Sequence, residues 1–259
     1  MDYHVLLALL APLLGGGIVL CLELGYRLGR RGAQKAHEAE KTGIGVIDAA
    51  VFGLLGLILA LTIGGSVSRL DHRRQLILQE TLAVGTAYQR LDILAPTDRT
   101  ALQGLFKEYL GSRLQLYRLL PEDVAAAKAE LAKSEALAGK IWSAAVTAAK
   151  AAAPQPAVML LLPALNQMFD VATERTRYFY IHLPPAFIAI LMVTAWACSV
   201  LAGYSLYNPR GRNFIHMAVF AVVITAAFSL IMDLDYPRLG LITLRDMDQG
   251  LLELWQSLR

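Results

Sequence analysis

The longest feature of the hydrophobic pattern is a helical stretch at residues 44–94. Its first part, 46–67, is almost entirely apolar. At about 1.5 Å per residue, a helix of that length crosses the hydrocarbon core of a bilayer, which is about 30 Å thick. No proline follows before Pro96, and charged residues continue beyond the apolar part at spacings that suit a helix. The pattern therefore predicts one helix that crosses a membrane and continues into water for several turns.

Three further apolar runs are long enough to span a bilayer, and they lie at 5–24, 187–206 and 214–232. The first is interpreted as a retained transmembrane helix, because it lacks the preceding positive charge and the cleavage pattern of a signal peptide. At its far end Glu23 precedes Arg27 by four residues, so we expect the two side chains to pair. A tight turn at 208–211 makes the last two spans a hairpin.

The segment between the second and third spans predicts a helical domain outside the membrane. It shows no strand-like alternation, and prolines divide it into helices expected at 97–120, 121–153 and 158–180. An amphipathic tail helix is expected at 246–258. The fold class is therefore all-α: an integral membrane protein with four transmembrane helices and an inserted extramembrane helical domain. The expected parts are transmembrane hairpins at 1–67 and 183–232, the helical domain at 68–182 and the tail at 233–259.

Composition supports a membrane protein and argues against several functions. The chain is 56% hydrophobic with a mean hydropathy of +0.48, and its net charge of +3 is too small to indicate a nucleic-acid partner. Both cysteines lie in apolar runs and the five histidines lack metal-binding spacing, so no metal or other cofactor is expected. No catalytic or phosphate-binding motif occurs, and an enzyme is not expected.

Charges on the short segments predict an orientation in the membrane. The two short connections between spans carry seven Lys and Arg residues, and the short tails carry three. Cytoplasmic segments carry an excess of such residues, whereas long loops translocate largely regardless of charge. The short connections are therefore expected in the cytoplasm, which places residues 68–182 on the outer side.

Two faces of the long second helix carry different residues. Gly56, Ala60 and Gly64 are spaced by four, as in the small-residue stripes that let membrane helices approach closely, and they predict a helix-packing face. A second stripe, starting at Asp48, has a bulky apolar middle between polar ends. It predicts a pore lining made by Phe52, Leu55, Leu59, Thr62 and Ser66, with a candidate anion-attracting mouth at Arg69 and Arg73. The alternative is a packed seam between interfacial charges.

Polar residues expected near the membrane surface form a second candidate cluster. One face of the helix at 158–180 is polar, and it could meet charged residues that follow the second span. The candidate network consists of Asp71, Arg74, Asn166, Asp170 and Arg177. We interpret it as a structural clamp rather than a chemical site.

Several short segments carry a more specific pattern. They are FGLLG at 52–56, RLDHRR at 69–74, Glu80, GTAY at 85–88, LNQMFD at 165–170, Pro184-Pro185 and DLDYPR at 233–238. Together they resemble the bacterial bestrophin-like proteins, which are multi-pass membrane proteins long catalogued as a domain of unknown function. The resemblance covers most of the chain and implies a location in the cell membrane, which in a bacterium is the inner membrane.

True bestrophins are pentameric anion channels. The resemblance therefore implies a homo-oligomer in the lipid bilayer that passes small anions such as chloride. That the oligomer is a pentamer is implied by this likeness alone. Their second helix lines the pore with bulky apolar neck residues, and matched positions place these at Leu57, Leu61 and Gly65. Glycine at the third position departs from the family pattern, and the register differs from the stripe described above. In bestrophins the large helical segment is cytoplasmic, opposite to the orientation expected from charge. Two functions stay open: a passive anion-permeable channel and a non-conducting membrane scaffold or sensor.

Overall fold

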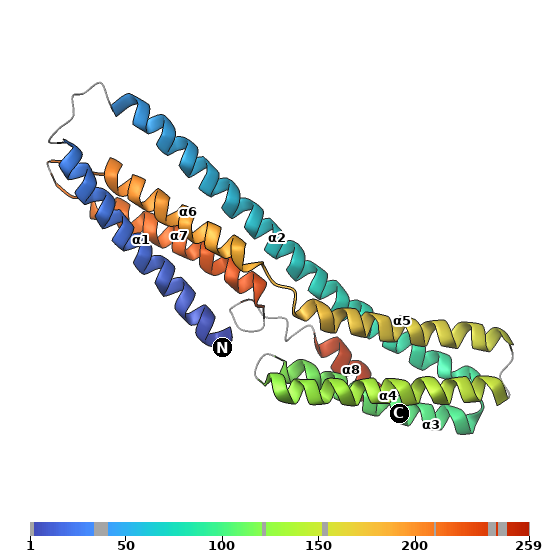
Figure 1. Ribbon diagram of the computed structural model, residues 1–259. Coiled ribbons are helices and arrows are strands. Elements are labelled where there is room, and N and C mark those ends of the chain that lie inside the picture. The colour runs from blue at the N-terminus through green and yellow to red at the C-terminus, as the bar shows by residue number, and fades with distance from the viewer. Residues whose placement is uncertain are drawn as a thin grey trace. The chain divides into compact units, whose positions relative to one another are not determined.

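Helices make up the described parts of the chain, and no strand occurs among them. The computed structural model describes residues 3–33, 41–120, 123–151, 155–209, 211–237, 242 and 248–258. The α-helices are α1 (Tyr3–Ala33), α2 (Lys41–Gln89), α3 (Pro96–Leu119), α4 (Val124–Ala151), α5 (Gln155–Phe179), α6 (Pro185–Ser205), α7 (Phe214–Asp235) and α8 (Gln249–Ser257), and a 3₁₀ helix, η2, follows α2 at Arg90–Ile93 (Figure 1). Four of them, α1, α2, α6 and α7, are long and apolar enough to cross a membrane.

The long second helix predicted from the sequence is confirmed. Helix α2 runs for 49 residues without interruption, and η2 closes it just before Pro96. The helix contains no proline, and its adjacent glycines Gly64 and Gly65 do not interrupt it, so it continues from an apolar into a charged sequence. Because of this continuity, α2 contributes residues to both compact units of the chain.

One unit, here called the membrane unit, comprises Met1–Arg69 and His182–Leu241. In it α1 and α6 lie side by side, and α1 also contacts α7 (Figure 1). Glycines allow the close approach of α1 and α6. A Cβ atom at Gly25 would overlap the carbonyl of Val200, and one at Gly203 would overlap the carbonyl of Leu22. The helix backbones are therefore in direct contact along this seam.

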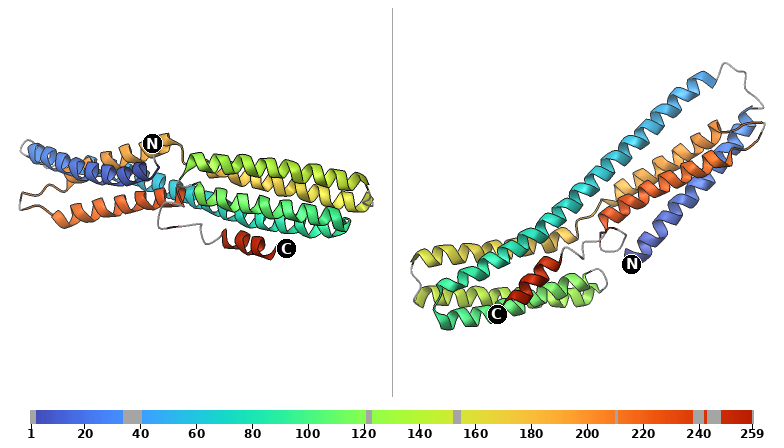
Figure 2. Two further views of the ribbon diagram at one scale, coloured as in Figure 1. Left: turned by 90° about the horizontal axis from the view of Figure 1, so that it is seen from below. Right: turned by 180° about the vertical axis from the view of Figure 1, so that it is seen from behind.

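The other unit, here called the extramembrane unit, comprises Leu70–Ile181 and Ile242–Arg259. Figure 2 shows α3 beside α4, and α8 packs on α3. Apolar side chains from α2, α3, α4, α5 and α8 form its core, and Phe106, Leu110 and Ile141 are fully buried. Helix α8 contributes Leu251, which is also fully buried.

Helix ends differ in detail from the expectation. The helix expected from residue 97 begins at Pro96, and no side chain caps it. The Asp123 carboxylate instead caps α4, accepting hydrogen bonds from the backbone N–H groups of Ala125 and Ala126 at 3.0 and 2.9 Å. The expected start of the tail helix, residues 246 and 247, lies outside the described residues, and α8 is described from Gln249.

Candidate functional site

The stripe of α2 predicted to line a pore packs against other helices of the same chain. Leu55, Thr62 and Ser66 are buried, and Phe52 and Leu59 are half-buried. The Phe52 ring meets the ring of Phe220 on α7 edge to face, with centroids 6.1 Å apart. At one end Ser205 Oγ donates a hydrogen bond to Asp48 Oδ2 at 2.7 Å. Side chains covered by other helices of the same chain are not free to line a passage, so this placement favours the alternative of a packed seam.

The opposite face of α2 is bare in the part of the chain that the structure describes. Leu57 and Leu61 are 56% and 68% exposed. Beside them, a Cβ atom placed on Gly56 or Gly64 would meet no heavy atom within 4 Å in the described structure, and Ala60 is exposed. The small residues predicted to pack helices therefore lie together with the leucines on one bare face.

The two arginines predicted to attract anions are engaged inside the subunit. Arg69 Nε donates to Asp235 Oδ1 at 2.8 Å, and its Nη2 donates to Ser66 Oγ at 2.8 Å. The Asp235 side chain is 1% exposed. Arg73 Nη2 donates to the backbone carbonyl of Ile181 at 2.7 Å. The charge of an arginine paired with a buried carboxylate is largely neutralised, so it attracts a passing anion only weakly. Arg69 is therefore better described as a structural residue.

The candidate polar network does not assemble as expected. Asp71 and Arg74 contact each other at 3.4 Å along α2, and both are exposed. Asn166, Asp170 and Arg177 are exposed on α5, and no described contact joins them to Asp71 or Arg74. A different network is buried in the same unit, and it is centred on Glu80.

Glu80 lies on α2, fully buried between two arginines. Arg113 Nε from α3 donates to Glu80 Oε1 at 2.9 Å, and Arg175 Nη1 from α5 donates to Oε2 at 2.6 Å. The Tyr117 hydroxyl donates to Oε2 at 2.7 Å, and the Arg175 guanidinium lies 3.5 Å above the Tyr117 ring. Arg175 also pairs with Asp248, which precedes α8. The network therefore joins α2, α3, α5 and the tail.

Charge pairing keeps Glu80 ionised despite its burial. Burial by itself would raise the pKa of Glu80, but the guanidiniums of Arg113 and Arg175 and the hydrogen bond from Tyr117 hold it below the usual value. Burial also raises the pKa of Tyr117, against the pull of both arginines, so that its hydroxyl keeps the proton it donates. The two positive charges of the arginines balance the two negative charges of Glu80 and Asp248, so the network is neutral overall.

A signal for this network was present in the sequence. Glu80 shares its helix face with apolar residues three, four and seven positions away, among them Leu76, Ala83 and Ala87, all of which are buried. Arg113 similarly lies within the apolar face of α3, next to Tyr109 and Leu116 on the helix surface. A charge on the core side of an amphipathic helix needs a partner of opposite charge, and two such helices in one domain could have been paired.

A comparison with models of protein families shows which family the chain belongs to. A family model described as the bestrophin-like domain matches residues 16–246. The chain belongs to the bestrophin-like family. Among curated proteins, none gives a significant match.

Solved structures show that this member has the bestrophin fold. The crystal structure of a bacterial bestrophin homologue from Klebsiella pneumoniae, phased with zinc, is 17% identical, with a TM-score of 0.62 over 92% of this chain and 98% of that chain. Two single-substitution variants of the homologue, also 17% identical, give TM-scores of 0.64 and 0.65 over 93% of this chain. They cover 99% and 98% of their own chains. The expectation of a bestrophin-like, four-span membrane protein is thereby confirmed.

Proposed function

We propose that this bestrophin-like protein forms an oligomeric channel for small anions, with the bare face of α2 lining the pore. The observation that carries the proposal is the exposure of Leu57 and Leu61 beside a row of small residues. Bulky apolar side chains can form a narrow constriction, and small residues let neighbouring subunits approach closely around an axis. The same two leucines are two of the three neck positions implied by the family resemblance.

Comparison with α7 distinguishes this face from an ordinary lipid-facing one. The bare face of α7 carries Ile215, Val222 and Val223, which are between 57% and 75% exposed, without glycine among them. Bulky aliphatic side chains of this kind suit contact with lipid tails. Glycines on a lipid-facing helix would leave backbone poorly packed, so the glycine-rich face of α2 favours contact with protein.

Anion preference follows from the family rather than from the described charges, since Arg69 is paired with Asp235. The third neck position, Gly65, is half-buried and carries no side chain that could narrow a pore. We therefore propose a constriction of two residue rings, Leu57 and Leu61. A non-conducting scaffold or sensor is the alternative, and it predicts no current under any condition.

Electrical recording from purified protein in planar bilayers, under an asymmetric chloride gradient, tests the proposal. Wild type is expected to give currents that reverse toward the chloride potential. Leu57→Ser and Leu61→Ser should raise the conductance, because a hydroxyl keeps a narrow passage wetted. The matched control is Val222→Ser, an equally exposed apolar position on α7 that should leave the conductance unchanged. Silence of wild type and of both leucine variants, with each still a folded oligomer, would favour the scaffold.

Assembly is tested separately from conduction. Gly64→Leu places a bulky side chain on the bare face and should weaken the oligomer, as measured by light scattering of the purified protein in detergent. Gly16→Leu on α1, where an added Cβ atom also meets no heavy atom within 4 Å, is the control. An unchanged oligomer for Gly64→Leu would remove this face from subunit contacts.

A further inference from the structure

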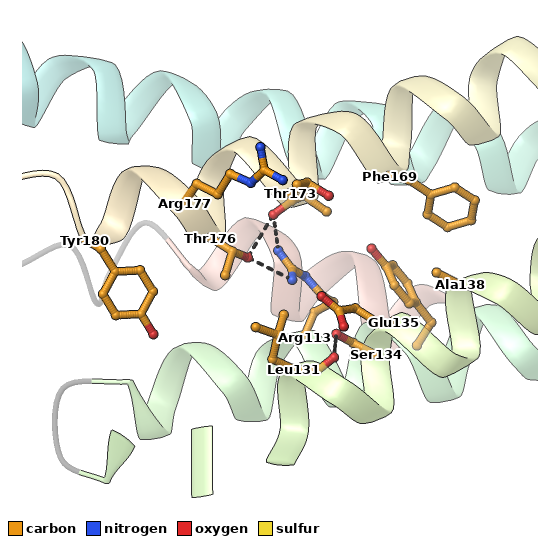
Figure 3. A pocket seen from close by; sticks show the side chains of 12 residues that line it. Arg113, Leu131, Ser134, Glu135, Ala138, Phe169, Thr173, Thr176, Arg177 and Tyr180 are labelled. Carbon is orange, nitrogen blue, oxygen red and sulfur yellow. Dashed lines mark hydrogen bonds between the residues drawn. The ribbon is translucent and has the colours of Figure 1, made fainter. Parts of the chain in front are cut away.

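The extramembrane unit contains a pocket that the proposed channel does not use. It lies between α3, α4 and α5 and has a volume of about 250 Å³ (Figure 3). Pockets for drug-sized ligands typically have volumes of about 300–1,000 Å³, so the size of this pocket suits a smaller molecule. Apolar surface comes from Leu131, Ala138 and Phe169, and polar groups come from all three helices.

The charges around the pocket balance each other. Arg113 at its floor is already neutralised by Glu80, and it donates further hydrogen bonds to Thr176 Oγ1 at 3.1 Å and to the Ala172 carbonyl at 2.8 Å. The remaining charged groups are Arg177 from α5 and Glu135 from α4, and both are exposed. Figure 3 shows them on different helices with Arg113 between them. Among the described residues neither makes an ion pair, so both charges are available to a ligand.

Tyr109 lines the same pocket, and its hydroxyl group is open to the pocket space. Tyr109 is 2% exposed, and within the described residues its hydroxyl group makes no hydrogen bond. Its ring meets the ring of Phe169 edge to face, with centroids 6.1 Å apart, which fixes the direction of the side chain. Burial raises the pKa of Tyr109, so the hydroxyl stays protonated and can donate. A tyrosine hydroxyl that opens onto a pocket can donate a hydrogen bond to an oxygen of a bound ligand.

We propose that this pocket binds a small zwitterion of the free amino-acid class with an apolar side chain. The ligand carboxylate contacts Arg177 and the Tyr109 hydroxyl, its ammonium group contacts Glu135, and its side chain packs against Phe169. A bare anion would meet the uncompensated carboxylate of Glu135, and a bare cation would meet Arg177. A molecule with both charges satisfies both walls. The proposal is independent of whether α2 forms a pore.

Calorimetric titration of the full-length protein in detergent tests the proposal. The probes are L-alanine, L-leucine and L-phenylalanine, with L-leucinamide lacking the carboxylate and N-acetyl-L-leucine lacking the ammonium group. At least one amino acid should bind, and both blocked forms of leucine should bind at least about tenfold more weakly than leucine itself. Binding of none of the three with a Kd below about 10 mM, or equal binding of a blocked form, would overturn the proposal.

Substitutions at the pocket identify which wall holds which group. Arg177→Gln should weaken amino-acid binding about tenfold or more but leave the amide unaffected, because the amide has no carboxylate to lose. Glu135→Gln should also weaken amino-acid binding, but it should leave binding of N-acetyl-L-leucine unaffected, because that form has no ammonium group to lose. Tyr109→Phe should weaken amino-acid binding. The controls are Arg118→Gln and Glu108→Gln, which change exposed charges of α3 outside the pocket. Arg177 and Glu135 are exposed, so unfolding is not expected, and unchanged affinity in all three pocket variants would overturn the proposal.

Discussion

The two units of the molecule achieve tight helix packing by different means. The extramembrane unit buries Glu80 between two arginines, whereas the membrane unit brings α1 and α6 together through Gly25 and Gly203. In water, apolar burial drives helices together and leaves room for a polar network in the core. In a bilayer that driving force is absent between helices, and close backbone contact replaces it. The same chain therefore uses charge to specify packing in one unit and the absence of side chains in the other.

Removing the charge of Glu80 should have the largest effect. Glu80→Gln leaves Arg113 buried without a counter-charge and Arg175 with Asp248 alone, and breaking a buried ion pair costs about 3–5 kcal/mol. We expect a clear loss of thermal stability, measured by circular dichroism on the purified protein in detergent. Glu108→Gln, an exposed change on α3, is the control and should shift the melting temperature little. Equal shifts for both variants would show that the network does not specify this unit.

Adding one methyl group at the glycine seam should have the next largest effect. Gly25→Ala places a Cβ atom against the Val200 carbonyl, so α1 must move away from α6, at a cost of about 1–3 kcal/mol. Gly16→Ala on the same helix is the matched control, since its Cβ atom meets no heavy atom within 4 Å. Alanine favours a helix over glycine, so this control should be neutral or stabilising. A stabilised Gly25→Ala would contradict close packing at this seam.

Much of the fold could be predicted from the sequence because its signals are local. Apolar length determines the four spans, and the absence of a breaker before Pro96 determines the continuous α2. The pairing of Glu23 with Arg27, four residues apart on one helix, was predictable for the same reason, and the two are 2.6 Å apart. Arg212 from the last connection also reaches Glu23, a contact that local spacing does not reveal.

The site could be predicted only in part, because hydrophobic pattern does not say which side of a membrane helix faces its own subunit. The stripe with Leu55 and Leu59 has the same apolar character as the face with Leu57 and Leu61, yet the first is largely covered and the second is bare. The glycine seam was overlooked although Gly25 and Gly29 are spaced by four, as in known helix-packing motifs. Which side of the membrane residues 68–182 face stays a prediction.

Substitution of Arg69 should have a smaller effect on stability, and it tests whether this residue stabilises the fold or selects ions. Arg69→Gln removes one partner of the buried Asp235 carboxylate, which still accepts from the backbone N–H of Leu183 at 2.8 Å and lies 3.6 Å from His182 Nδ1. A weakened buried hydrogen-bond pair of this kind costs about 1–3 kcal/mol. We expect a lower melting temperature, with the ion selectivity of any current unchanged. A shift of the reversal potential toward cations without loss of stability would instead assign Arg69 to the pore mouth.

Acidification should have the most gradual effect, and it acts on the extramembrane unit. The folded-state pKa of Glu80 lies below its ordinary value of 4.5, so its ion pairs stabilise the protein fully above that pH. As the pH falls below 4.5, the unfolded chain binds a proton that the folded chain refuses, and stability is lost at up to about 1.4 kcal/mol per pH unit. Other carboxylates titrate as well, so the measurement is the difference in melting temperature between wild type and Glu80→Gln. That difference should be constant from about pH 7 to 5 and shrink toward about pH 3. A constant difference over the whole range would mean that Glu80 is not held ionised by its arginines.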